Sequence, residues 1–256
     1  MDYGDVFHTV ETMGRRGWRA ERIGEADGYP LFALERRPQA TQAAAQAPSL
    51  LISAGIHGEE PASVVGLLRW LTDDAERWVE QIHFTIVPCL NPWGYERGLR
   101  HAAHGRDLNR EFDAPTHPAV HAFRRLVAGK RFDLFLDLHE DCDFTAAYLY
   151  EVQQARPPAG RPTLGRRILE RMKPDVALSH GELVERFTTD QGMITAEFSP
   201  EEAKRLSGAP IALYVYAHHA PHVVTLETPG RQPLHLRARL QGRAIEETCR
   251  YLTDPA

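Results

Sequence analysis

The stretch LISAGIHGEEPASV, from Leu51 to Val64, joins an apolar run to two polar residues that can carry chemistry. The run ends at Gly55, and His57 and Glu60 follow three residues apart. A continuous apolar run of this kind is typical of a strand buried in a parallel or mixed sheet. In open α/β sheets, the residues just beyond a strand end line the binding crevice. We therefore expect a buried strand here, with a functional site at its carboxyl end.

Strands and helices alternate along the chain. Strands are predicted at 29–37, 49–55, 82–90, 131–139 and 221–230, and helices at 59–71, 119–129, 163–172 and 233–252. The uncharged segment 38–48 is typical of a surface turn, and 91–118 of a long functional loop. The alternation predicts a three-layer α/β/α sandwich with a mixed, largely parallel central sheet. The length fits a single domain, residues 1–256.

The composition excludes several classes of function. The formal charge is −5, from 30 basic and 35 acidic residues without a basic cluster, so no nucleic-acid partner is expected. Cys89, Cys142 and Cys249 are odd in number and far apart, which argues against a disulfide framework. No signal peptide is visible, and no run approaches the roughly 20 apolar residues of a membrane span. We expect a cytoplasmic protein without a membrane partner, whose oligomeric state the sequence does not indicate.

Two later apolar strands also end in polar groups, at His139 and Glu227. Strand ends of an open α/β sheet can share one crevice, so these residues can meet His57 and Glu60. Two histidines and one glutamate form a zinc ligand set that leaves a position free for water. A lone His-x-x-Glu pair is common by chance, and the two later strand ends are what favour a metal site.

A second histidine group, His218, His219 and His222, is the main alternative metal cluster. Adjacent histidines on an extended strand point to opposite faces, which favours a surface role. A serine hydrolase is not expected, because no G-x-S-x-G motif is present.

Six motifs follow one another in a recognisable order. They are HGEE, NPWG, RGLR, GRDLNR, FLDLH and TLETPG, and they extend from His57 to Gly230. This ordered set resembles the zinc carboxypeptidases of the carboxypeptidase A type, over roughly Tyr29 to Gly230. The spacing is most similar to small bacterial members, including the murein-peptide amidases. The family also has a deacylase branch, the succinylglutamate desuccinylases and aspartoacylases.

The resemblance implies a metal site and a general base. His57, Glu60 and His139 would bind one Zn2+ per chain. Glu227 would take a proton from metal-activated water and then protonate the leaving amine.

The resemblance also implies residues that bind the substrate and the developing charge. Arg100 would stabilise the oxyanion, with Arg97 and Arg106 as the alternatives. Asn109 and Arg110 would hold the terminal carboxylate of the substrate, Arg110 through a bidentate fork.

The implied function is a zinc-dependent metallocarboxypeptidase that hydrolyses a C-terminal peptide bond. The alternative is a zinc-dependent deacylase of N-acyl amino acids, since a small peptide and an acyl amino acid both offer a free carboxylate. A non-catalytic metal-binding protein is a third interpretation, which the presence of Glu227 and Arg100 disfavours. The sequence does not indicate the preferred side chain.

Some polar residues near these motifs have two interpretations. Glu140 begins an acidic run, Glu140 to Asp143, which predicts a solvated loop, a preference for a cationic substrate or a second metal. Asp137 lies on the same strand face as His139 and either orients that ligand or bonds the backbone. Asp107 is expected to cap a sharp turn. Tyr214 and Tyr216 are expected to pack.

Overall fold

An eight-stranded mixed sheet lies at the centre of the computed structural model, in the order β1-β2-β4-β3-β5-β10-β6-β9. The structure describes residues 2–39, 46–155, 157–158, 160–184, 187–195 and 197–254. Most of the predicted turn at 38–48 falls outside these residues. None of the helices in the described part of the chain has the length and apolar character needed to cross a bilayer.

The central strands of this sheet run parallel. β4 (His83–Val87), β3 (Ser49–Ala54), β5 (Leu134–Asp141) and β10 (His222–Pro229) are neighbours in parallel pairs. Antiparallel pairs extend the sheet on both sides, through β2 (Tyr29–Arg36) and β1 (Arg19–Ala26) at one edge and β6 (Tyr148–Gln153) at the other. The remaining strands are β9 (Met193–Thr195), which pairs with β6, and the separate hairpin of β7 (Leu183–Val184) and β8 (Phe187–Thr188).

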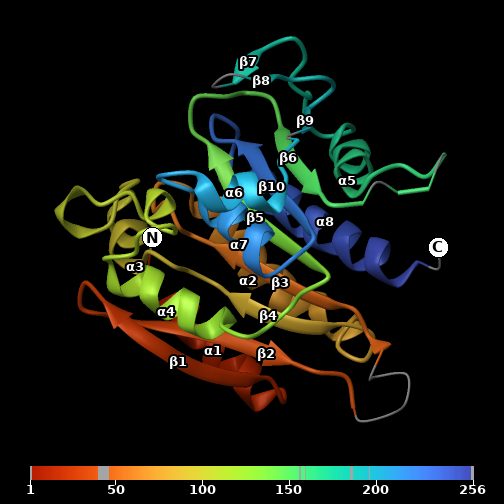
Figure 1. Cartoon of the computed structure of the whole chain (residues 1–256). Helices are drawn as coiled ribbons and strands as arrows, with labels where there is room; N and C mark the ends of the chain where they lie inside the picture. Colours follow the sequence, from red (N-terminus) through yellow and green to blue (C-terminus); the bar gives the residue numbers. More distant parts are fainter. Residues whose placement is uncertain are drawn as a thin grey trace.

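Helices cover both faces of the sheet, as Figure 1 shows. One apolar core joins the sheet to α1 (Gly4–Arg15), α2 (Pro61–Asp73), α5 (Leu164–Met172) and α8 (Leu234–Thr253). A second core, on the other face, joins it to α4 (Pro118–Val127), α6 (Pro200–Arg205) and α7 (Ile211–His218). The predicted three-layer α/β/α sandwich is therefore confirmed.

Strand β5 shows how the sequence assigns side chains to these two cores. Leu134, Leu136 and Leu138 belong to the core with α2 and α8, whereas Phe135 belongs to the core with α4 and α7. Successive side chains of a strand point to opposite faces. His139 therefore shares the face of Phe135, which is the face covered by α4, α6 and α7.

The chain changes direction around β3. It passes from β3 through α2 to β4 on one side, and then through α4 to β5 on the other side of β3. In open α/β sheets a ligand binds beyond the carboxyl ends of the strands at such a switch point. His57 and Glu60 follow β3 and His139 lies near the end of β5, so the fold places all three at this crevice.

The long loop predicted at 91–118 is partly helical. It contains α3 (Pro92–Arg97) and short 3-10 turns at 103–105 and 108–110. The Asn91 side chain caps α3 by accepting a hydrogen bond from the Gly94 amide at 3.0 Å, and Gly98 ends it with a φ of 62°. A helix of this length shows no hydrophobic periodicity, so capping residues determine it.

The histidines of HHAPH do not lie on one strand as expected. His218 ends helix α7, His219 caps it, and only His222 begins strand β10. Tyr214 and Tyr216 lie on the same helix and pack as expected, with the Tyr216 hydroxyl donating to the carbonyl of Phe198 at 2.8 Å.

Candidate metal centre

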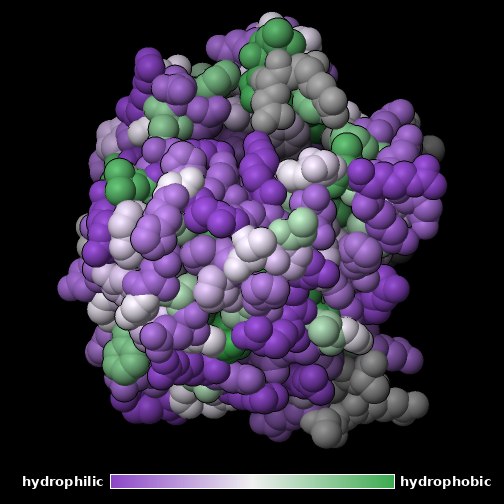
Figure 2. All heavy atoms as spheres, turned by 60° about the vertical axis from the view of Figure 1, so that its left-hand side comes forward, coloured by the Kyte–Doolittle hydropathy of each residue, from purple (hydrophilic) through white to green (hydrophobic). Residues whose placement is uncertain are grey.

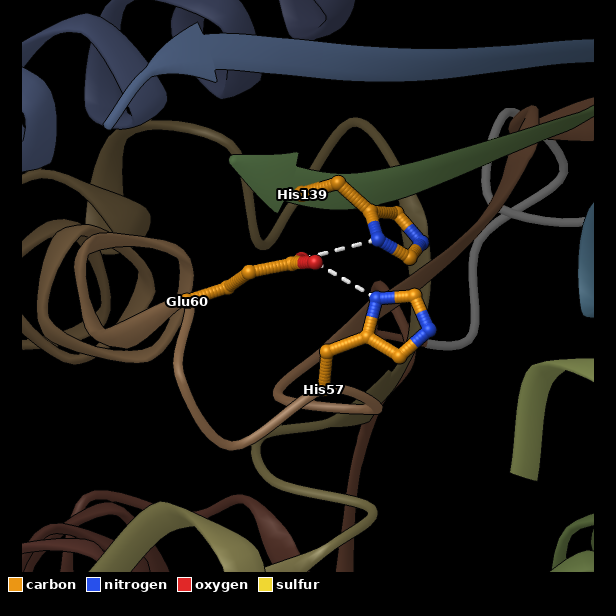
Figure 3. Close-up of side chains that lie close together, drawn as sticks. All are labelled: His57, Glu60 and His139. Carbon is orange, nitrogen blue, oxygen red and sulfur yellow. Dashed lines mark hydrogen bonds and ion pairs between the residues drawn. The ribbon is translucent and has the colours of Figure 1, made fainter. Parts of the chain in front are cut away.

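His57, Glu60 and His139 form a buried group of potential metal ligands. The Glu60 carboxylate lies between the two imidazole rings, 2.5 Å from His57 Nδ1 and 2.9 Å from His139 Nδ1 (Figure 3). One potential ligand atom from each residue lies within 4.8 Å of the other two. Two imidazole nitrogens and a carboxylate oxygen, buried and converging, fit a zinc-like divalent ion.

The turn between His57 and Glu60 depends on a glycine. The Glu60 amide donates to the His57 carbonyl at 3.4 Å, and Pro61 then begins α2. A Cβ on Gly58 would lie 2.0 Å from the carbonyl carbon of Gly94 in α3. Only glycine therefore allows this turn to pack against α3, which brings His57 and Glu60 to the same side.

A second carboxylate lies near the Nε2 atom of each histidine in the group. Asp137 Oδ2 lies 3.0 Å from His139 Nε2, and its Oδ1 accepts from the Ser53 hydroxyl at 2.6 Å. This supports the orienting interpretation of Asp137, because outer carboxylates fix the tautomer and the ring plane of a metal-ligating histidine. Asp107 Oδ1 lies 3.4 Å from His57 Nε2, close enough for an ion pair but not aligned as a hydrogen bond.

Asp107 was expected only as a turn cap. It does cap the turn, since its carboxylate accepts from the Asn109 amide at 3.0 Å, but it also contacts His57 and Arg100. The sequence feature that could have indicated the contacts with His57 and Arg100 is the position of Asp107 in the GRDLNR motif, two residues before Asn109.

Opposite charges tune the ionisation of the group. Burial alone would raise the pKa of Glu60, but His139 and His57 lower it to about 2. Burial would lower the pKa of His139, but the carboxylates of Asp137 and Glu60 raise it well above its ordinary value. Burial would also raise the pKa of Asp107, but His57 and Arg100 hold it well below its usual range. Glu60 and Asp107 are therefore ionised at neutral pH.

Glu227 stands beside this group on strand β10. It is in register with His139 on β5 and with Tyr148 on β6, and it lines the same cavity. Burial raises the pKa of Glu227 well above its ordinary value; Glu60 acts in the same direction and His139 opposes it. A carboxyl group that readily takes up a proton is suited to proton transfer.

Of the three loop arginines, Arg100 is the one that lines the cavity. Its Nη1 lies 3.8 Å from Glu60 Oε1, and its Nε lies 3.4 Å from Asp107 Oδ2. The Arg97 guanidinium carbon instead lies over the Trp93 ring, 4.5 Å from the ring centroid, and Arg106 forms an ion pair with Glu111. Arg100 thus places a positive charge beside the potential metal ligands.

Asn109 and Arg110 also line the cavity. Asn109 Oδ1 accepts from the Ile211 amide at 2.9 Å, which joins the 3-10 turn to α7. Arg110 Nη1 donates to the Asn109 carbonyl at 3.0 Å, and its side chain passes Gly208, where a Cβ would lie 3.8 Å from Arg110 Cδ. Both residues therefore face the cavity from the side of the α6–α7 connection.

The cavity has a volume of about 570 Å³, which suits a small ligand. It contains the metal-ligand group, Glu227, Arg100, Asn109 and Arg110 together. The remaining lining is largely apolar and aromatic, and the sequence motifs did not indicate it: Phe144, Tyr148, Tyr150, Val152, Leu183, Val184, Phe187, Phe198, Leu206, Ala209, Pro210, Ala212, Leu213 and Val223.

The acidic run after His139 does not form the additional site considered from the sequence. Glu140 accepts from the Ala62 amide at 2.5 Å and pairs with Arg237 of α8 on the opposite sheet face, because strand residues alternate. Burial raises the pKa of Glu140 to about 7, although Arg237 opposes this. Among the described residues, His57, Glu60 and His139 are the only group that could hold a metal.

Two characterised proteins share part of this sequence. Murein peptide amidase A of Escherichia coli K12 is 47% identical over 74 residues, which are 28% of this chain and 28% of that protein. Carboxypeptidase SOL1 of Arabidopsis thaliana is 34% identical over 104 residues, which are 37% of this chain and 21% of that protein. The chain thus spans less than a third of the length of these relatives.

Solved structures share the fold over almost the whole chain. A proposed metallopeptidase from Shewanella denitrificans OS217 matches with a TM-score of 0.81 at 22% identity, covering 98% of this chain and 89% of that one. Carboxypeptidase A from Helicoverpa armigera matches with a TM-score of 0.69 at 16% identity, covering 99% and 73%. The chain therefore has a carboxypeptidase A-like fold.

One family model matches more than half of the sequence. The succinylglutamate desuccinylase/aspartoacylase catalytic domain matches residues 46–191, a range that includes His57, Glu60 and His139 and ends before Glu227. Because the match covers more than half of the 256 residues, the chain belongs to the succinylglutamate desuccinylase/aspartoacylase family, on a metallocarboxypeptidase-like fold.

Proposed function

We propose that the chain is a zinc-dependent hydrolase that cleaves an amide bond next to a free carboxylate and releases a C-terminal residue. The observation that carries this proposal is one cavity that holds the buried His57, Glu60 and His139 group together with Glu227 and a guanidinium group. The relatives that the chain matches, a carboxypeptidase and a murein peptide amidase, support an amide substrate. We assign the activity to a single domain, residues 1–256.

His57, Glu60 and His139 would hold one zinc ion, and Asp137 would keep the His139 ring in place through its Nε2. The chemistry that zinc supplies in such a site is to polarise the substrate carbonyl and to acidify a water molecule. Glu227 would take the proton from that water and deliver it to the leaving nitrogen. Its raised pKa, which burial causes, favours this return of the proton.

Arg100 and Arg110 would bind two different negative charges. Arg100, beside Glu60 and Asp107, would stabilise the charge that develops on the carbonyl oxygen. Arg110 would bind the carboxylate of the substrate, and the Asn109 amide group would add a hydrogen bond. The contact of Asn109 with the Ile211 amide keeps this binding site fixed relative to α7.

A deacylase of N-acyl amino acids is the second candidate function. The family model favours it, because that family is described by desuccinylase and aspartoacylase activities. Its substrates also combine an amide bond with a free carboxylate, so the same residues would serve the same steps.

Metal content and substrate range test the proposal together. We would purify the full chain, measure its metals, and follow hydrolysis of short peptides and N-acyl amino acids with and without a chelator. About one zinc per chain and chelator-sensitive release of C-terminal residues would support the peptidase. Zinc with turnover of acyl amino acids alone would support the deacylase. An absence of turnover after zinc has been bound would contradict both.

A further inference from the structure

Four aromatic residues form a continuous wall along one side of the cavity. Phe144, Tyr148, Tyr150 and Phe187 all line it, and we call them the aromatic wall. Successive ring centroids lie 5.3, 5.9 and 6.2 Å apart, each pair in an edge-on arrangement. Such pairs hold one another in place, so the wall is a preformed surface rather than a set of loose side chains.

The aromatic wall begins at the reacting groups. Tyr148 stands directly opposite Glu227 in the pairing of β6 with β10, and Tyr150 stands opposite Thr225. The Tyr148 hydroxyl donates to Asp141 Oδ2 at 2.6 Å, so its polar atom already has a partner. A substrate whose amide bond lies next to Glu227 therefore has one flank against this wall.

The hairpin of β7 and β8 continues the apolar surface to the rim of the cavity. Phe187 and Val184 line the cavity, and Leu183 does so while 67% exposed. The hairpin is tied at its base by the Gly181 amide, which donates to the Thr189 carbonyl at 2.8 Å. Figure 2 shows hydrophobic residues gathered at the top of the molecule, where this hairpin lies, above a mostly hydrophilic face. Leu183 is thus an exposed apolar side chain at the rim, next to the buried Val184 and the half-buried Phe187.

The charges in the cavity disfavour a substrate with a second carboxylate. Carboxylates outnumber guanidinium groups among the described residues that line it, even without Glu140, whose side chain pairs with Arg237 on the other sheet face. The remaining acids are Glu59, Glu60, Asp137, Asp141, Asp143 and Glu227. The two lining arginines, Arg100 and Arg110, already have proposed tasks at the oxyanion and the terminal carboxylate. Within the described lining, no other arginine or lysine could pair with an additional anion.

We propose that the aromatic wall binds a large apolar group that flanks the cleaved amide bond. The substrate is then an amide with one free carboxylate and an apolar neighbour, rather than an acyl derivative of aspartate or glutamate. This inference rests on the proposed hydrolase function, and it adds the substrate class.

Two series of substrates, tested on the zinc-loaded full chain, locate the apolar group. One series varies the acyl group on alanine (acetyl, succinyl and benzoyl), and the other varies the amino acid under an acetyl group (alanine, aspartate, glutamate and phenylalanine). We expect kcat/KM to be about 10- to 100-fold higher for the apolar member of one series than for its acetyl-alanine reference, the range that burial of one large apolar group gives. Equal values in both series would overturn the proposal.

Variants of Phe187 connect that preference to the aromatic wall. We consider the ratio of kcat/KM for the apolar substrate to kcat/KM for acetyl-alanine. Phe187→Ala should bring this ratio close to one, and Phe187→Tyr should keep it at the value of the unaltered chain. Phe7→Ala, which removes a 45% exposed aromatic ring of α1, is the matched control and should leave the ratio unchanged. An unchanged ratio in Phe187→Ala would refute the role of the wall.

Failure of the hydrolase function has a different signature. If the zinc-loaded chain hydrolyses none of these compounds, the proposed function is wrong. Calorimetric titration with benzoyl-alanine, acetyl-phenylalanine and acetyl-alanine then tests the wall alone. Tighter binding of one of the first two would support the wall, and equal or absent binding would overturn it.

Discussion

Gln241 donates a hydrogen bond from its Nε2 to the main-chain carbonyl of His139, at 2.7 Å. The same amide group donates to the Thr228 hydroxyl at 2.9 Å, so one side chain of α8 joins the ends of β5 and β10. One turn earlier on α8, Arg237 pairs with Glu140. The closing helix therefore holds the end of β5 at the residue proposed as a metal ligand, from the face opposite the cavity.

Gln241→Leu should weaken metal binding without touching a ligand. The change leaves the buried His139 carbonyl without this donor, which costs about 1–3 kcal/mol of folding free energy. We expect a loss of metal affinity of about 10-fold or more, since a metal site depends on groups that orient its ligands. Urea unfolding would measure the loss of folding free energy, and a competition titration with a coloured chelator would measure the loss of metal affinity. Gln81→Leu, at an exposed position, is the control and should change neither the stability nor the metal affinity. If Gln241→Leu also changes neither value, α8 does not hold His139 in place for metal binding.

Glu227→Gln should retain the metal and lose most of the turnover. Glutamine keeps the shape of the side chain but cannot accept the proton, and loss of a general base costs about 10²- to 10⁴-fold in kcat. Metal analysis and kcat measured on the same preparation separate the two effects. Glu170→Gln, an exposed substitution on α5, is the control. Turnover close to that of the unaltered chain would exclude Glu227 as the base.

Arg110→Ala should raise KM more than it lowers kcat, because a carboxylate contact holds the ground state and the transition state alike. Loss of a charged hydrogen-bonding partner corresponds to an increase in KM of about 10- to 100-fold. A substrate with an amidated C-terminus provides the sharper comparison. It should be equally poor for the variant and the unaltered chain, and a KM defect that persists with this substrate would rule out a carboxylate contact.

Glu111→Gln should destabilise the loop that carries Asn109 and Arg110. The Glu111 carboxylate accepts from Arg106 Nε at 2.7 Å, from the Thr116 hydroxyl at 2.9 Å and from the His117 amide at 3.1 Å. Burial would raise the pKa of Glu111, but Arg106 and Thr116 lower it overall. We expect a loss of about 1–3 kcal/mol in the free energy of unfolding at pH 7.

The pH dependence of this loss follows from the lowered pKa. A carboxylate with a lower pKa in the folded state contributes stability above its unfolded pKa, about 4.3, and this contribution is lost as the pH falls through the folded pKa. The difference in the free energy of unfolding between Glu111→Gln and the unaltered chain, measured with urea, should therefore shrink below about pH 4. Glu11→Gln, exposed on α1, is the control. A difference that stays constant with pH would show that the charge of Glu111 is not involved.

The strand ends could be predicted from the sequence because apolar runs are local signals. The run before Gly55 and the run before His139 each form a buried strand, and the order of the motifs indicated that the two strand ends meet. Helix α8 could also be predicted, from the helical spacing of the apolar residues within its own sequence. These elements are defined by residues within one turn or one strand of each other, which is the range over which periodicity is informative.

Features that depend on contacts distant in sequence could not be predicted in this way. The acidic run predicts a solvated loop, a preference for a cationic substrate or a second metal, yet strand alternation directs Glu140 to α8, where Arg237 is its partner. The orienting contact of Gln241 joins residues 102 positions apart. Likewise, the aromatic wall combines β6 with a hairpin of four described residues, too short for any periodicity.

The proposed ligands belong to two distant parts of the chain. His57 and Glu60 are neighbours on one turn, whereas His139 follows Glu60 by 79 residues. An ion held by all three would act as a removable cross-link across that segment and would reduce the freedom of the unfolded chain. A covalent bridge over a loop of comparable length is worth about 4 kcal/mol. The supply of metal would then govern the lifetime of the protein as well as its activity, because chains that have lost the ion open more often and are exposed to proteolysis.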